Sequence, residues 1–197
     1  MKAEDRERIR IMKLFFASDV HGSAFYCEKM LEAFDRENAD KLVLLGDILY
    51  HGPRNDLPKD YAPKKVAALL NERKEKILCV RGNCEAEVDQ MMLEFPVLAD
   101  YGFLSDGKVE IYLTHGHVYN AKNPLPMAKG AVLMCGHTHI PACEEHEGFV
   151  YMNPGSVSIP KEGSNPGYII LENGCFSWRT LDGTEYMRWG QNKYNVS

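Results

Sequence analysis

The sequence has no long hydrophobic run. No stretch approaches the roughly 18 consecutive apolar residues that a membrane-spanning helix needs. Residues 1–11 are rich in charge and lack the apolar core of a secretory signal peptide. We therefore expect no membrane segment, a cytoplasmic location, and an N-terminal extension over residues 1–11 that contributes little.

Paired cysteines and an excess of positive charge are also missing. The six cysteines form no Cys-x-x-Cys pair, and the formal net charge is −5. Free cysteine in a strand or helix behaves as a small hydrophobe, so we expect reduced thiols. The acidic balance, with no basic groove bearing aromatic residues, argues against stable nucleic-acid binding. It does not exclude an anionic substrate, because bound cations can dominate the local field.

Internal repeats and low-complexity linkers are absent as well. The chain has 197 residues, of which 45% are hydrophobic. That length and composition suit one globular domain, which we place at residues 12–197.

The first half of the chain alternates expected strands with expected helices. Apolar runs at 13–18, 41–45 and 77–80 predict buried strands. Ser23 is typical of a helix N-cap, and Pro63 of a helix start. This alternation indicates a parallel sheet with right-handed crossovers.

The second half predicts strands with little helix between them. Asp106-Gly107 and Asn173-Gly174 are turn signals between apolar runs. We expect strands near 109–114, 131–135, 149–152, 167–171 and 175–180. A parallel half is thus followed by a more antiparallel half, and the tail after Asp182 has no assigned structure.

Residue types that bind metals follow the ends of five expected strands. His137 and His139 stand two residues apart after one of them, and in extended backbone such residues face the same side. Alone, this pair could equally be an exposed polar loop. Similar residues follow the other strand ends, where ligands bind in open α/β sheets. They are Asp19, His21, Asp47, Asn83, His115 and His117.

The motifs run Asp-x-His, Gly-Asp, Gly-Asn, His-Gly-His and Gly-His-Thr-His along the chain. As a set over residues 12–180 they resemble the calcineurin-like metallophosphoesterases. The stretches 46–55, 81–85 and 153–160 resemble the small bacterial YfcE-type phosphodiesterases. The resemblance implies an α/β fold, a two-sheet mixed β-sandwich flanked by helices. It also implies two divalent metal ions, with manganese as the first expectation and iron, zinc, nickel or magnesium as alternatives.

The resemblance further implies seven metal ligands in two sets. These are Asp19, His21 and His139 for one ion, Asn83, His115 and His137 for the other, and Asp47 bridging both. A water held between two cations loses a proton near neutral pH and can attack phosphorus in line. The implied reaction is hydrolysis of a small phosphodiester.

Cys84 is a departure from the wider family, which usually has histidine at this position and assigns it to the leaving group or phosphate. A thiol is uncharged near pH 7 and is a weak hydrogen-bond donor. We therefore expect Cys84 to favour diesters with good leaving groups over monoesters. The alternative is that Cys84 only packs at a helix start.

Other residues near the motifs allow two interpretations each. His117 could contact the phosphate or only support the ligands, and Arg54 could pair with the phosphate or be solvated. We expect Glu85 and Asp89 to be cap and surface residues of the helix after Asn83.

Two competing functions fit the same fold. A retromer subunit resembles it but serves protein assembly, and its metal-site positions are degraded, whereas all seven positions here hold competent side chains. Phosphomonoesterases and protein phosphatases typically carry Gly-Asp-x-x-Asp-Arg-Gly, but residues 46–52 lack that arginine. The leading prediction is a phosphodiesterase of small molecules that forms a homo-oligomer.

Overall fold

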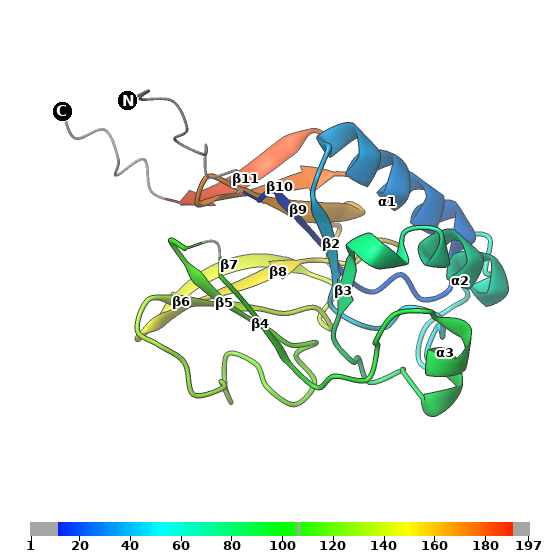
Figure 1. Ribbon diagram of the computed structural model, residues 1–197, viewed down its shortest axis with the longest axis horizontal. Coiled ribbons are helices and arrows are strands. Elements are labelled where there is room, and N and C mark those ends of the chain that lie inside the picture. The colour runs from blue at the N-terminus through cyan, green and yellow to red at the C-terminus, as the bar shows by residue number, and fades with distance from the viewer. Residues whose placement is uncertain (1–11, 106, 191–197) are drawn as a thin grey trace, which may run out of the picture.

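The computed structural model describes residues 12–105 and 107–190. In this part of the chain, two β-sheets are stacked face to face, and the helices gather at one side of the stack (Figure 1). The predicted α/β two-sheet mixed sandwich flanked by helices is therefore confirmed. The predicted extension over residues 1–11 and Asp106 of the predicted turn lie outside the described residues.

The first sheet has the strand order β11-β10-β9-β1-β2-β3. Its parallel part consists of β1 (Leu14–Ala17), β2 (Lys41–Leu44) and β3 (Ile77–Cys79). Its antiparallel part consists of β9 (Gly167–Glu172), β10 (Cys175–Thr180) and β11 (Glu185–Gly190). The predicted turn at residues 173–174 joins β9 to β10, and β11 forms part of the tail that had no assigned structure.

The second sheet has the order β4-β5-β6-β8-β7. Its strands are β4 (Gly102–Ser105), β5 (Glu110–Leu113), β6 (Ala131–Met134), β7 (Pro141–His146) and β8 (Phe149–Pro154). The outer pairs are antiparallel as expected, but β5, β6 and β8 run parallel to one another. The loop between β5 and β6 makes this possible without a helix, because its Ala121 and Met127 pack on the outer face of the sheet.

Period-two alternation in β1 divides the interior into two cores. Phe15 and Ala17 pack with the helices, whereas Leu14 and Phe16 face the second sheet. The helical elements are α1 (Ala24–Glu37), α2 (Pro63–Asn71), the 3₁₀ turn η1 (Lys74–Lys76) and α3 (Glu87–Met92). Ser23 caps α1 as predicted, since its Oγ accepts a hydrogen bond from the Tyr26 N–H.

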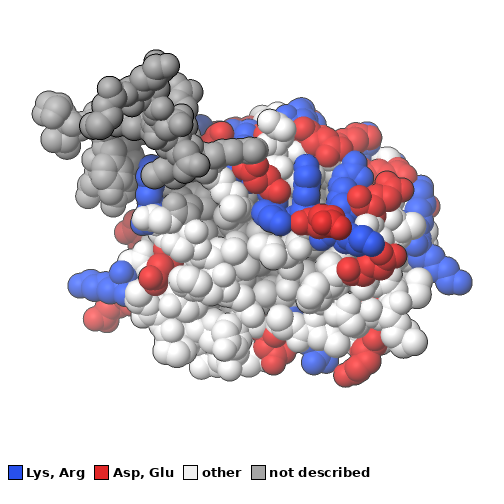
Figure 2. All heavy atoms as spheres, in the orientation of Figure 1, with Lys and Arg blue, Asp and Glu red and all other residues white. Residues whose placement is uncertain are grey.

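The surface of the described residues carries charge of both signs. On the face drawn in Figure 2, basic and acidic side chains alternate over the side that holds α1 and α2, and uncharged atoms cover most of the centre. In the described part of the chain, no helix combines the length and the apolar character needed to cross a membrane.

Candidate metal centre

The loops that follow β1, β2, β5 and β6 are tied together by backbone hydrogen bonds. The N–H groups of Asp19 and His21 donate to the carbonyls of Gly46 and Asp47, at 3.1 and 2.9 Å. The Gly136 N–H donates to the His115 carbonyl at 2.9 Å. The His137 N–H donates to Asp19 Oδ2 at 3.0 Å and joins the two pairs of loops. The carboxyl ends of strands from both sheets therefore meet in one place, as the motif order predicts.

The backbone at these strand ends is left-handed rather than extended. Asp19, His21, Asp47, His137 and His139 have φ between 50° and 68°. The expectation of an extended backbone at His137 and His139 is therefore wrong. The side chains converge because each loop turns sharply after its strand, and residues in such sparsely populated conformations cluster at functional sites.

Two glycines of the motifs allow the loops to approach each other closely. A Cβ on Gly82 would lie 2.2 Å from Asp47 Oδ1, and a Cβ on Gly136 would lie 1.9 Å from Ser18 Oγ. Neither distance is compatible with a side chain. The glycine before Asn83 and the glycine before His137 are therefore required by close packing around the carboxylates.

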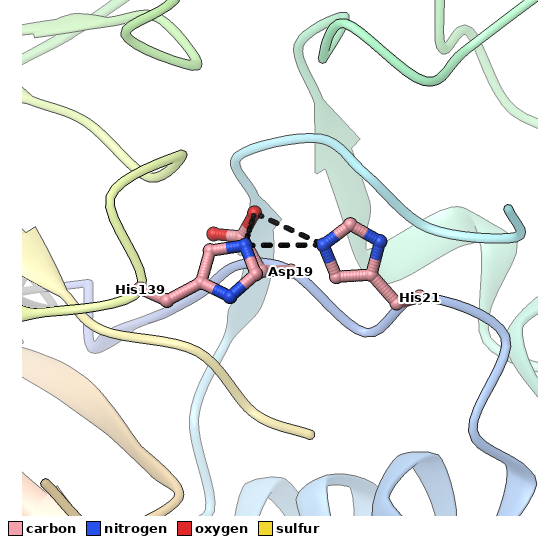
Figure 3. A group of neighbouring side chains, drawn as sticks. All are labelled: Asp19, His21 and His139. Carbon is pink, nitrogen blue, oxygen red and sulfur yellow. Dashed lines mark hydrogen bonds and ion pairs between the residues drawn. The ribbon is translucent and has the colours of Figure 1, made fainter. Parts of the chain in front are cut away.

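Asp19, His21 and His139 form the first group of side chains (Figure 3). The Nε2 atoms of the two histidines are 3.2 Å apart. Asp19 Oδ1 lies 3.2 Å from His139 Nε2 and 3.5 Å from His21 Nε2. All three residues are almost completely buried.

The histidine tautomers follow from the hydrogen bonds of the Nδ1 atoms. The Nδ1 atoms of His21, His139 and His115 lie 2.8, 2.8 and 2.6 Å from the carbonyl oxygens of Tyr50, Ile159 and Leu45. A carbonyl only accepts, so each Nδ1 must carry the proton. In the neutral rings, every Nε2 lone pair then points into the centre, as in metal-binding histidines.

Asp47 lies between the first group and a second one. Its Oδ2 is 3.6 Å from His21 Nε2 and 3.5 Å from His115 Nε2. Asn83 Oδ1 is 3.1 Å from His115 Nε2. The His137 ring packs against the His115 ring with centroids 5.0 Å apart. This geometry suits a carboxylate that contacts two cations at once.

The centre has more hydrogen-bond acceptors than donors. Asp19 Oδ1 is buried without a hydrogen-bond donor of suitable geometry, although it lies next to two Nε2 lone pairs. Burial lowers the pKa of His115, but hydrogen bonding and charge from Asp47 and Asp19 outweigh it and raise that pKa to about 9. The same balance, with Asp19 as the main partner, raises the pKa of His21. The cluster attracts positive charge, and its oxygen and imidazole donors fit divalent transition metals.

A cavity of about 410 Å³ opens directly onto these residues. Cys84, Arg54 and Lys161 line it together with His21, Asp47 and His139. Burial, followed by the nearby Asp47 carboxylate, raises the pKa of the Cys84 thiol, which is therefore neutral. Sequence reasoning missed Lys161, whose only signal is its place directly after the turn at residues 153–160.

His117 lies outside this cavity. Its exposed ring has its centroid 5.5 Å from that of His115 and 6.2 Å from that of His137. It lines a neighbouring hollow, to which His137 also contributes. Burial, followed by the proximity of His115, lowers the pKa of His117, which favours the neutral ring.

Glu85 differs from its predicted role. It is 4% exposed and precedes α3, and its carboxylate accepts hydrogen bonds from the N–H groups of Asp47, Ile48 and Gly82 at 2.9, 2.7 and 2.5 Å. The prediction of a surface cap residue is therefore wrong for Glu85. It is correct for Asp89, whose Oδ2 accepts from the Ala86 N–H.

The chain is similar to proteins of one known family. The family model of the calcineurin-like phosphoesterase superfamily domain matches residues 12–174. The phosphodiesterase YfcE of Escherichia coli K12 is 48% identical over 167 residues, which cover 85% of this chain and 91% of that protein. A probable metallophosphoesterase, YsnB of Bacillus subtilis, is 32% identical over 55% of this chain and 64% of its own length.

Solved structures give the same result. The structure of the E. coli phosphoesterase YfcE has a TM-score of 0.89 at 46% identity and covers 92% of this chain and 100% of that one. Vacuolar Protein Sorting 29 from Cryptosporidium parvum, at 15% identity, has a TM-score of 0.58 over 91% of this chain and 98% of that one, so it shares the fold. This chain belongs to the calcineurin-like phosphoesterase superfamily.

Proposed function

We propose that this protein is a divalent-metal-dependent phosphodiesterase that hydrolyses small phosphodiesters. The observation that carries the proposal is the position of Asp47 Oδ2 between His21 and His115, which suits a carboxylate shared by two cations. The similarity to a phosphodiesterase over most of the chain supports the same substrate class.

The proposed ligands fall into two sets with one shared residue. They are Asp19, His21 and His139; Asn83, His115 and His137; and Asp47 in both. When bound, two divalent cations would stabilise charge on the phosphoryl oxygens and activate a water molecule. The chain's contribution is to fix the geometry: Nδ1–carbonyl hydrogen bonds hold the rings of His21, His115 and His139, and the Cys84 N–H holds Asp47 Oδ1 at 2.9 Å.

Arg54 and Lys161 are the proposed contacts for the anionic phosphate. Both line the cavity, and in the described part of the chain neither side chain has an ion-pair partner. A cation at the mouth of a cavity attracts an anion and can bind its oxygens directly. For His117 we retain the proposed supporting role at the His115–His137 side.

Metal removal and return tests the proposed function. We expect the metal-stripped protein to cleave neither bis(4-nitrophenyl) phosphate nor 4-nitrophenyl phosphate. Manganese should restore hydrolysis, and the diester should then be cleaved faster than the monoester. With magnesium or zinc, the rate of diester cleavage should differ from the rate with manganese. The measurement is release of 4-nitrophenolate from both esters under each metal and with a chelator.

The result separates the competing functions. Bound metal with no hydrolysis of either ester would contradict the enzyme and favour a protein-assembly role. Faster hydrolysis of the monoester would favour a phosphomonoesterase. Inductively coupled plasma analysis of metal content makes the first outcome distinct from simple failure to bind metal.

Cys84→His tests the specificity argument. Imidazole can carry the positive charge that the thiol lacks, so a dianionic monoester should gain more than a monoanionic diester. We expect the monoester-to-diester ratio of kcat/KM to rise about tenfold, roughly the effect of one added charged hydrogen bond. Cys175→His, at a partly exposed position on β10, is the matched control. An unchanged ratio in Cys84→His would show that Cys84 only packs.

A further inference from the structure

A second cavity adjoins the candidate metal centre. It has a volume of about 440 Å³, and apolar and aromatic side chains form most of its wall. Its lining includes Tyr50, Tyr61, Pro63, Cys84, Val88 and Met92, and its two charged residues are Lys64 and Asp89. No motif identified in the sequence assigns a role to this cavity.

The two cavities share structural elements. Cys84 lines both of them, and its N–H donates to Asp47 Oδ1. The Tyr50 carbonyl accepts from His21 Nδ1 at 2.8 Å. The Tyr61 ring packs so closely on the loop after β1 that a Cβ on Gly22 would lie 2.5 Å from it. The wall of the apolar cavity is thus continuous with the segments that hold the centre.

The chemistry of the two cavities is complementary to the two parts of a phosphodiester. The first cavity offers Arg54 and Lys161 beside the candidate metal ligands, which suits the anionic phosphoryl group. The second offers aromatic and aliphatic surface, which suits an uncharged ester group. Cys84 stands at the boundary, so a phosphate held in the first cavity can direct one ester group into the second.

Apolar side chains of α3 also remain exposed at the second cavity. Val88 is 59% exposed and Met92 is 41% exposed, and both contribute to the cavity wall. Apolar surface that is grouped around a hollow beside a reactive centre is typical of a ligand subsite.

We propose that the apolar cavity is a subsite for an aromatic or bulky apolar ester group, on the Cys84 side of the phosphorus. This inference rests on the proposed phosphodiesterase function and narrows its substrate class. Diesters with a ring on that side are preferred over diesters with two small alkyl groups. Burial of one ring should strengthen binding roughly 20-fold.

Two probes whose only possible leaving group is the poor leaving group methoxide, so that they are cleaved very slowly, measure this preference by binding. Methyl phenylphosphonate and methyl methylphosphonate are both monoanions and differ only in the group on the P–C bond. Calorimetric titration of the full chain loaded with manganese should give a dissociation constant roughly 20-fold lower for the phenyl compound. In the double variant Val88→Thr with Met92→Gln, the phenyl preference should fall to roughly threefold or less, since both changes keep volume and add polarity. Binding of the methyl compound should stay the same.

Met91→Gln is the matched control. Met91 lies on the same helix and is 83% exposed, but it does not line the cavity, so this variant should keep the full preference for the phenyl compound. An equal phenyl preference in the double variant and the wild type would overturn the subsite. The double variant could instead keep the preference for the phenyl compound and change only the sedimentation velocity of the protein. That result would also overturn the subsite, and it would identify this surface as an interface between copies of the chain.

The probes also separate this inference from the function on which it rests. If the methyl compound binds and the phenyl compound binds no better, the metal centre stands and the subsite is wrong. If neither compound binds to protein that contains manganese, the proposed function itself fails.

Discussion

Asp47→Asn is expected to lower kcat/KM for bis(4-nitrophenyl) phosphate about a thousand-fold, the effect of removing a central electrostatic group from a reaction centre. The metal content of the variant should fall from two ions per chain to one or fewer. The reason is that Asp47 Oδ2 lies close to both His21 Nε2 and His115 Nε2, at 3.6 and 3.5 Å. An amide keeps one acceptor oxygen but loses the negative charge that two cations would share.

The orientation of the asparagine side chain explains why the shared metal-binding position should be lost. Asp47 Oδ1 accepts the Cys84 N–H at 2.9 Å, so the amide oxygen of asparagine is drawn to that position. The amide NH₂ then faces the two Nε2 lone pairs, where it occupies the space of a cation. Both the charge and the coordinating atom are removed from the shared position.

Asp35→Asn is the control for Asp47→Asn. Asp35 lies on α1, is exposed, and forms a surface ion pair with Arg73 at 2.8 Å. Such pairs contribute about 0–1 kcal/mol, so activity and metal content should be unchanged. The measurement is steady-state hydrolysis together with metal content per chain. Retention of two ions and of wild-type rates in Asp47→Asn would refute the shared carboxylate.

The sequence was sufficient to predict which residues lie at the candidate site, because their type and the order of the parallel strands are both readable from it. Residue type identifies Asp19, His21 and Asp47 as ligands that a metal could use, and parallel strands must bring their carboxyl ends to one edge. The structure places these residues together. Their backbone conformation could not be predicted from the sequence. The left-handed φ values arise from contacts between loops, such as the hydrogen bond from the Asp19 N–H to the Gly46 carbonyl.

Strands with weak hydrophobic patterns were the other limit. β7, Pro141–His146, is a partly to fully exposed edge strand with the sequence Pro-Ala-Cys-Glu-Glu-His. β11, Glu185–Gly190, is an edge strand that is also largely exposed. Period-two alternation of apolar residues is the main sequence signal for a strand, and β7, with polar residues on both faces, does not carry it. In β11 the alternation is limited to Met187 and Trp189, which pack on the core between the sheets. Pairing with β8 and β10 stabilises these segments instead.

The role of Glu85 also could not be predicted from the local sequence. A carboxylate at the start of a helix usually accepts a hydrogen bond from the helix N-terminus, and Asp89 in the first turn of α3 does so from the Ala86 N–H. The partners of Glu85 include Asp47 and Ile48, which are 38 and 37 residues away in the chain. No local pattern contains that information, so sequence reasoning assigns this buried carboxylate to the surface.

Glu85→Ala is therefore expected to destabilise the protein by about 4 kcal/mol, because three buried N–H groups lose their acceptor. For a chain of this size that corresponds to a fall in Tm of roughly 10 °C. Glu85→Gln should lose about 1–3 kcal/mol, since its NH₂ cannot replace the second acceptor oxygen and leaves at least one N–H unsatisfied. Thermal unfolding by circular dichroism gives both values.

The effect of Glu85 should extend to metal binding, because its carboxylate joins the loop that carries Asp47 to the loop that carries Gly82 and Asn83. Without it, the two loops can separate, and the manganese affinity of the folded variant should fall about 10- to 100-fold, as for other residues that orient metal ligands. Glu87→Ala, an exposed acid two residues away, is the matched control and should lose less than about 1 kcal/mol. Equal Tm values for the two alanine variants would show that Glu85 does not join the loops.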